Sequence, residues 1–217
     1  MVKKICIIVL FLFAAKPFFG QGFKFGVFFN PAVTWLKSDV QDIKPQNAHP
    51  GFDFGMSVNY FFAQNYAFAT GVSLFNTSGT LKYENGATFK VKNGEPKNLE
   101  QGENIKFRIQ YVKIPIGLKF KTHRIGRMIY SANLGFDPMI RTTQRADFKE
   151  EKKIDLDKEI KFFNMGWHFG GIAAYSLGGE AAVYGGLAFM NTFTDITQHS
   201  RDKISSGNVM LRIGVLF

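Results

Sequence analysis

The stretch from residue 51 to residue 62, GFDFGMSVNYFF, alternates bulky apolar side chains with small or polar ones. A period of two is typical of a β-strand whose two faces have different surroundings. Because the bulky face is the apolar one, we expect hydrocarbon outside the sheet and a polar interior. A soluble barrel that carries lipid inside would show the opposite pattern. One face holds Phe52, Phe54, Met56, Val58, Tyr60 and Phe62, and the other holds Asp53, Gly55, Ser57 and Asn59.

The same alternation recurs in seven other segments of the chain. The sequence therefore predicts an all-β fold, an eight-stranded antiparallel transmembrane β-barrel. Aromatic residues near the strand ends, such as Tyr60, Tyr66 and Tyr130, are expected to form a girdle at the membrane interface. The other segments are 23–36, 66–77, 105–120, 128–140, 162–177, 180–193 and 207–217.

The connections between these segments alternate in length. Short periplasmic turns and four long extracellular loops are typical of outer-membrane barrels, and eight strands place both barrel termini on the periplasmic side. The predicted turns are 63–65, 121–127 and 178–179, and the predicted loops are 37–50, 78–104, 141–161 and 194–206.

The segment 105–120 contains a change of phase. Its apolar residues occupy odd positions up to Tyr111 and even positions from Val112 onward. A one-residue slip would expose lysines to lipid, so the sequence predicts a β-bulge near Tyr111 and Val112 that keeps the apolar face outward. On this interpretation Phe107 belongs to the outer aromatic girdle, and Lys106 and Arg108 point into the lumen.

Residues 1–20 predict a secretory signal peptide, and residues 21–217 the barrel domain. Lys3 and Lys4 precede an apolar run that is too short for a spanning helix, and a small residue, Gly20, precedes the expected cleavage site. We therefore expect export to the cell outer membrane. Outer-membrane lipid would surround the barrel, and the barrel-assembly machinery would be its partner during insertion.

Composition excludes several kinds of chemistry. The formal net charge is +10, but no exposed basic stripe emerges, so nucleic-acid binding is not expected. The single cysteine, Cys6, lies in the predicted signal peptide, and no two of the four histidines have metal-ligand spacing. No metal site and no cofactor is predicted. The predicted inward charges have both signs, which favours internal ion pairs, and His168 is expected to be a hydrogen-bonded interior residue.

One combination of residues could support catalysis. His199 and Ser200 with Asp195 or Asp202 would supply a base, a nucleophile and a carboxylate in the fourth loop. Adjacent residues rarely point the same way, so no catalytic residue is predicted and a non-enzymatic role is favoured. A lipid-modifying enzyme and a narrow pore or small-ligand carrier are the alternatives. Eight strands enclose a lumen that side chains can fill, which disfavours the pore.

The turn 121–127 concentrates positive charge at the periplasmic rim. Lys121, Arg124 and Arg127 are its three cations. Each could contact anionic phospholipid headgroups and so fix the depth of the barrel, or the three could dock an acidic periplasmic partner.

Several stretches resemble the PorT-type outer-membrane β-barrel family of Bacteroidetes. Residues 111–119, YVKIPIGLK, resemble the family's Tyr-Leu-Glu-Ile-Pro-Leu-Leu-Leu-Lys stretch, and Asn164-Met165-Gly166 followed by Gly170-Gly171 is similar to its Asp-x-Gly and Gly-x-Gly pattern. The resemblance implies an outer-membrane location and, for some members, a part in type IX secretion. The expected function is thus an envelope or type IX secretion accessory that contacts secretion-system or envelope proteins through its loops or periplasmic rim.

Overall fold

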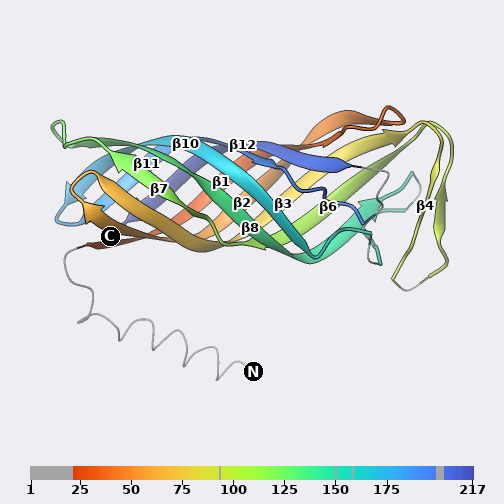
Figure 1. Ribbon diagram of the computed structural model, residues 1–217, viewed down its shortest axis with the longest axis horizontal. Coiled ribbons are helices and arrows are strands. Elements are labelled where there is room, and N and C mark those ends of the chain that lie inside the picture. Colours follow the sequence, from red (N-terminus) through yellow and green to blue (C-terminus); the bar gives the residue numbers. More distant parts are fainter. Residues whose placement is uncertain (1–21, 93, 150, 158, 199–202) are drawn as a thin grey trace, which may run out of the picture.

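The computed structural model describes residues 22–92, 94–149, 151–157, 159–198 and 203–217 as a closed barrel (Figure 1). The predicted signal peptide lies outside the described residues. Among those residues no helix is long and apolar enough to cross a membrane, a result with no bearing on a crossing by strands. The barrel strands are β1 (Phe23–Ser38), β2 (Ile43–Ala63), β3 (Tyr66–Tyr83), β6 (Glu103–Lys113), β7 (Ile116–Lys121), β8 (Met128–Asp147), β10 (Phe163–Gly178), β11 (Ala181–Thr192) and β12 (Ile204–Leu216).

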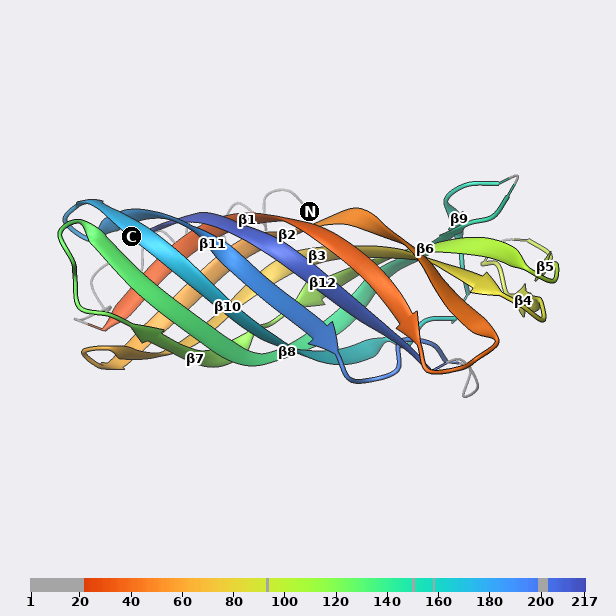
Figure 2. The same cartoon turned by 90° about the horizontal axis from the view of Figure 1, so that it is seen from above.

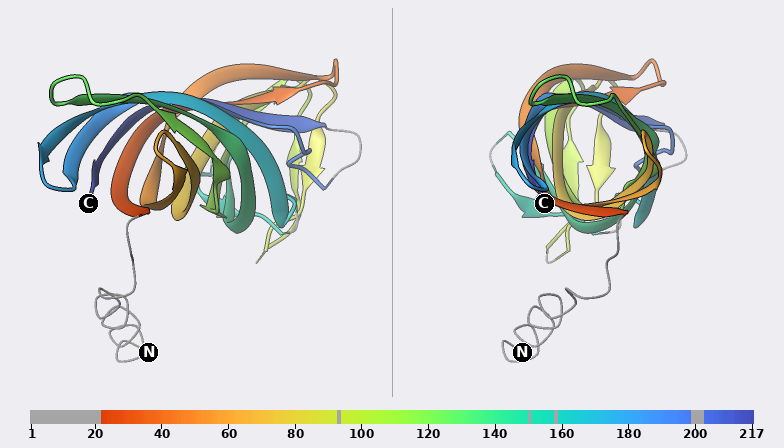
Figure 3. Two further views of the ribbon diagram at one scale, coloured as in Figure 1. Left: turned by 60° about the vertical axis from the view of Figure 1, so that its left-hand side comes forward. Right: turned by 90° about the vertical axis from the view of Figure 1, so that its left-hand side faces the viewer.

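The pairings between these strands close an antiparallel ring of eight positions. β6 and β7 lie end to end and share one position, because both pair with β3 on one side and with β8 on the other. β12 pairs with β1 and completes the ring, which is seen from one end in the right-hand view of Figure 3. Pro115, which has no N–H, interrupts the ladder between β6 and β7. The predicted eight-stranded barrel is confirmed.

The short connections gather at one end of the barrel, on the left in Figure 1. They follow β2, β7 and β10, and the first of them is the two-residue turn 64–65. In the turn after β10, Gly178 and Gly179 have φ of 116° and 57°, values that side chains rarely permit. β1 begins and β12 ends at this same end, so it is the periplasmic one.

The outer surface of the barrel wall carries a belt of exposed apolar side chains. At its periplasmic edge, aromatic rings contact one another: Phe23 lies 4.8 Å from Tyr60, and Tyr66 lies 5.7 Å from Phe120 between ring centroids. This is the predicted girdle. Such a surface is stable only against hydrocarbon. The belt includes Val27, Phe29, Phe54, Met56, Val72, Leu74, Leu134, Phe169, Leu187, Leu211 and Ile213.

Toward the extracellular end the polarity of the strands is reversed. On β3, the exposed Val72 and Leu74 are followed on the same face by Asn76 and Lys82. The opposite face of the same strand carries Phe75, Leu81 and Tyr83, all buried. The barrel wall therefore leaves the hydrocarbon near residue 75 of β3 and continues into water with its apolar side chains inward.

This reversal overturns the predicted bulge in the fourth strand. Ile105, Phe107, Ile109 and Tyr111 are each at most 1% exposed and point inward, and the register with β3 runs without a shift through Lys113 and into β7. Phe107 is therefore not a girdle residue, and Lys106 and Arg108 face outward. The phase change in the sequence marks the passage from lipid to water. A register shift does occur opposite Gln110 and Tyr111, but the extra residue, Thr142, lies on β8.

The first predicted loop, 37–50, is mostly strand. β1 continues to Ser38 and β2 begins at Ile43, so that only residues 39–42 connect them. The prediction failed because it required apolar side chains on the outer face, which strands above the membrane do not have. The next two connections carry short strands: β4 (Ala87–Phe89) pairs with β5 (Lys97–Leu99), and β9 (Ile154–Asp155) pairs with β8 (Figure 2).

Inward apolar side chains of these extensions fill the extracellular half of the barrel with one hydrophobic core. Phe89 of the β4–β5 hairpin packs edge-on against Phe107, with ring centroids 5.8 Å apart. Leu156 and Ile196 from the third and fourth connections belong to the same core. We call this cluster the extracellular core. Its largest fully buried members are Tyr111, Phe75, Phe107, Leu81, Ile105 and Ile109.

The boundary between lipid and water can be tested on one strand. We expect Val72→Arg to lower the free energy of unfolding by about 2–4 kcal/mol, because Val72 lies in the belt, and Asn76→Arg on the same face to cost about 0–1 kcal/mol. Urea unfolding in phospholipid vesicles, followed by the fluorescence of the two tryptophans, measures both values. Equal costs at the two positions would contradict the assigned boundary.

Candidate functional site

Below the extracellular core the lumen is polar and contains two neighbouring cavities. The inner cavity has a volume of about 70 Å³ and is lined by Asp53, Lys113, Lys119 and Arg212 among others. The second, of about 50 Å³, lies at the periplasmic mouth. Asn59, Lys119 and Leu216 line both cavities, so the two cavities lie next to each other along the lumen.

An ion pair lies at the top of the polar lumen. The Lys113 ammonium is 2.7 Å from Oδ2 of Asp53, and both side chains are almost fully buried. The amide of Asn30 donates a further hydrogen bond of 3.3 Å to the same oxygen. Charges buried this deeply persist only when paired, so the two residues fix each other in place. The expected internal pairing of lumenal charges is present here.

A second acid–base contact joins β8 and β10. Nδ1 of His168 lies 3.0 Å from Oδ2 of Asp137. The ring packs over Gly135, where an added Cβ would lie 2.9 Å from Cε1 of His168. His168 is thus the hydrogen-bonded interior residue that the sequence predicts. Oδ1 of Asp53 and Oδ1 of Asp137 are buried without a hydrogen-bond partner among the described residues, which leaves two acceptors for donors such as water.

The periplasmic mouth is surrounded by cations. Lys24 pairs with Glu180 at 2.7 Å, and the hydrogen bond and charge of Lys24 lower the pKa of the Glu180 carboxyl. The Lys121 ammonium lies 4.3 Å from the centroid of the Phe61 ring. Arg124 donates a 2.8 Å hydrogen bond to the Ser176 hydroxyl. Lys24, Lys121 and Arg124 all line the second cavity.

The structure separates the three cations of the turn 121–127. Lys121 and Arg124 line the mouth of the lumen. Arg127 instead donates a hydrogen bond of 3.1 Å to the hydroxyl of Tyr175, an exposed residue of the girdle, and stacks 5.9 Å from its ring centroid. Arg127 thus lies on the outer surface of the barrel, whereas the other two face the lumen. The position of Arg212 opposite Lys119 in the inner cavity was not predicted, because alternation gives the face of a residue but not its height in the barrel.

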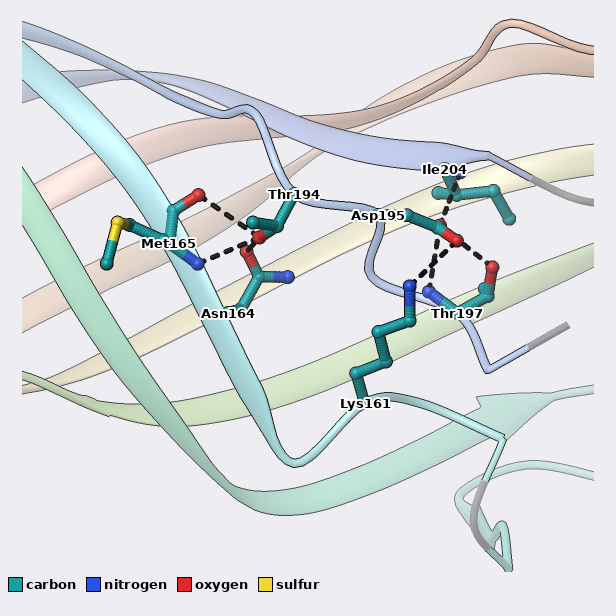
Figure 4. A network of polar contacts seen from close by, with 7 residues as sticks. All are labelled: Lys161, Asn164, Met165, Thr194, Asp195, Thr197 and Ile204. Atoms are coloured by element: carbon teal, nitrogen blue, oxygen red, sulfur yellow. Dashed lines mark hydrogen bonds and ion pairs between the residues drawn. The ribbon is translucent and has the colours of Figure 1, made fainter. Parts of the chain in front are cut away.

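The fourth extracellular connection is organised by Asp195 (Figure 4). Its Oδ1 accepts hydrogen bonds from the backbone N–H groups of Thr197 and Ile204 and from the Thr197 hydroxyl, at 2.9–3.1 Å. Its Oδ2 lies 3.1 Å from the Lys161 ammonium. Four donors thus occupy Asp195, one of the two carboxylates that the catalytic alternative could use. His199, Ser200 and Asp202, the other members of that combination, lie outside the described residues.

A metal site was not predicted. In the ranges that the structure describes, no three residues of the types His, Cys, Asp and Glu approach closely enough to hold a metal ion.

A closed antiparallel ring with an apolar outer belt, an aromatic girdle and a charged lumen defines an outer-membrane β-barrel protein. Residues 16–198 match the family model of the outer membrane protein β-barrel domain, and the chain belongs to this family. Its location is the outer membrane. A search of curated protein sequences found no match.

Several solved barrels are similar in shape at low sequence identity. Neisserial surface protein A (NspA) shares 12% identity, with a TM-score of 0.49 and coverage of 90% of this chain and 96% of that one. OprG from Pseudomonas aeruginosa shares 14%, with a TM-score of 0.49 and coverage of 90% and 95%. The outer membrane protease OmpT from Escherichia coli shares 8%, with a TM-score of 0.45 and coverage of 91% and 96%.

Proposed function

We propose that this protein is a non-enzymatic envelope accessory that acts by binding other proteins through its loops or its periplasmic rim. The observation that carries the proposal is the extracellular core, which fills the outer half of the lumen with packed side chains. A barrel filled in this way is a rigid support for contact surfaces and is poorly suited to passing solutes.

The extracellular rim is a stable surface for such contacts. Arg108 and Asp147 form an ion pair at 2.6 Å, and Arg145 and Asp155 form another at 2.7 Å. Burial alone would raise the pKa of the Asp147 carboxyl, but hydrogen bonds from Arg108 and from the backbone N–H of Lys153 outweigh burial and lower it. These contacts hold β6, β8 and β9 together above the membrane.

The resemblance of residues 111–119 to the PorT-type family supports type IX secretion as the process that the protein assists. This stretch spans the boundary between the extracellular core and the polar lumen: Tyr111 is buried in the core, Lys113 pairs with Asp53, and Lys119 lines both cavities. The stretch that resembles the PorT-type family therefore contributes side chains both to the extracellular core and to the polar lumen.

The secretion role is tested in cells that lack the protein. We expect deletion to reduce export of type IX cargo, and affinity purification from native membranes to recover a component of the secretion system. Wild-type protein supplied from a plasmid should restore export. Normal export together with altered lipid A in the deletion strain would contradict the accessory role and favour the lipid-modifying enzyme.

The pore alternative makes a different prediction. We expect the protein reconstituted in planar bilayers to give no stepwise ionic current, because the extracellular core blocks the lumen. A wide porin in the same lipids serves as the positive control, and heat-modifiable migration on SDS gels shows that the sample is folded. Reproducible conductance steps from the folded protein would contradict the closed lumen.

A further inference from the structure

We infer that the periplasmic half of the lumen is a binding site for a phosphate-type oxyanion, held between Lys119 of β7 and Arg212 of β12. These two strands stand four positions apart in the ring of eight, so they form opposite walls of the barrel. Both side chains line the inner cavity. The site lies inside the lumen, and its test does not depend on the proposed function.

Lys119 is a buried cation without a counterion. The residue is only 9% exposed, and within the described part of the chain it makes no ion pair or hydrogen bond. The charges that act on it are those of Arg212, Lys121 and Lys24, all positive. Burying an ammonium group among like charges is unfavourable unless an anion joins them. The lumen around Lys119 therefore favours a bound anion.

Arg212 supplies the geometry that a phosphate group requires. Its guanidinium is a planar fork of N–H donors that matches two oxygens of a phosphate or carboxylate, whereas a lysine acts as a point charge. Arg212, like Lys119, has no hydrogen-bond or ion-pair partner among the described residues. The Arg212 guanidinium and the Lys119 ammonium, on opposite walls of the barrel, would contact a tetrahedral oxyanion from two sides.

The charge balance of the lumen agrees with an anionic ligand. Six cations line the two cavities, against three carboxylates on or directly behind their walls. The surplus of three positive charges suits a dianion better than a single carboxylate. The cations are Lys24, Lys113, Lys119, Lys121, Arg124 and Arg212, and the carboxylates are Asp53, Glu180 and Asp137, the last behind His168.

The size of the cavity and the route into it further limit which anions can bind. A water molecule needs roughly 10–15 Å³ of cavity, so the inner cavity of about 70 Å³ has room for several waters or one small oxyanion. The extracellular core closes the outer side, and the second cavity opens at the mouth beside Lys121 and Arg124. The anion therefore enters from the periplasm, either as free phosphate or as the phosphate of a lipid headgroup.

Binding is measured with inorganic phosphate by isothermal titration calorimetry, on full-length protein folded in a phosphate-free neutral detergent. We expect saturable binding to the wild type and at least tenfold weaker binding to Lys119→Met and to Arg212→Gln. The matched control is Arg127→Gln, which removes one positive charge from the same end of the barrel but on its outer face. This control should bind phosphate as the wild type does.

A second arm distinguishes the two sources of phosphate. The protein is placed in nanodiscs of phosphatidylcholine alone or with one-fifth phosphatidic acid, and the phosphate titration is repeated. Weaker phosphate binding in the discs that contain phosphatidic acid, seen for the wild type and for Arg127→Gln alike, would identify a lipid headgroup, whereas unchanged binding would identify free phosphate. The inference is overturned if folded wild type binds no phosphate, if Lys119→Met and Arg212→Gln retain wild-type affinity, or if Arg127→Gln weakens binding equally.

Discussion

Lys113→Met is expected to lower the free energy of unfolding by about 3–5 kcal/mol, because it leaves the Asp53 carboxylate buried without its cation. Methionine retains most of the apolar stem of the lysine, so the substitution leaves little empty space. The Lys113 ammonium also lies 5.2 Å from the centroid of the Phe75 ring, and this contact is lost together with the ion pair. The loss of stability should therefore reflect the removal of the positive charge and not the creation of a cavity. Urea unfolding in phospholipid vesicles measures it.

The double variant Lys113→Met with Asp53→Asn is the control for this experiment. It removes both charges and should recover much of the lost stability, because a neutral amide costs less to bury than an unpaired carboxylate. If the single and double variants unfold at the same urea concentration, the pair does not stabilise the lumen as a unit.

Phe107→Ala is expected to cost about 3–5 kcal/mol, the usual loss when a large buried aromatic side chain is truncated. Phe107 is 1% exposed and packs against Phe89, so the cavity left behind would loosen the β4–β5 hairpin as well. We expect faster amide exchange in residues 87–99, measured by mass spectrometry, together with the lower unfolding free energy.

Phe136→Ala is the matched variant, because Phe136 is a lipid-facing aromatic residue of the outer interface and is 59% exposed. It should cost clearly less and leave exchange in the hairpin unchanged. The girdle interpretation of Phe107 predicts equal effects for the two substitutions. Equal effects would thus favour the predicted β-bulge in residues 105–120 and contradict the burial of Phe107 in the extracellular core.

The membrane-embedded part of the barrel could be predicted from sequence because each strand there repeats one local rule, apolar outward and polar inward. The same rule failed at Phe107 and in residues 43–50, where the strands stand in water. In residues 105–120, the same sequence of apolar and polar residues fits two structures. One is a strand with a β-bulge inside the membrane, and the other is an unbroken strand that extends from the membrane into water. The height at which the hydrocarbon ends decides between them, and that height is a property of the whole barrel.

The candidate site was only partly predictable for a related reason. Alternation correctly placed Lys119 and Arg212 on inward faces, and composition drew attention to Lys121 and Arg124 in their turn. The meeting of Lys119 and Arg212 around the inner cavity depends on the stagger of strands that are far apart in sequence. Likewise, three similar cations in one turn divide between lumen and lipid because only Arg127 lies beside Tyr175.

The reversal of polarity along the strands also sets an order of assembly. Outward-facing side chains such as Lys82, Arg108 and Arg145 must travel through the hydrocarbon layer before they reach the cell surface, and a bare strand could not carry them across without great cost. The core residues between them come from strands and hairpins distant in sequence, and they can meet only after that passage. We therefore expect the outer lumen to close only after these strands have crossed the membrane, with cell-surface water outside them.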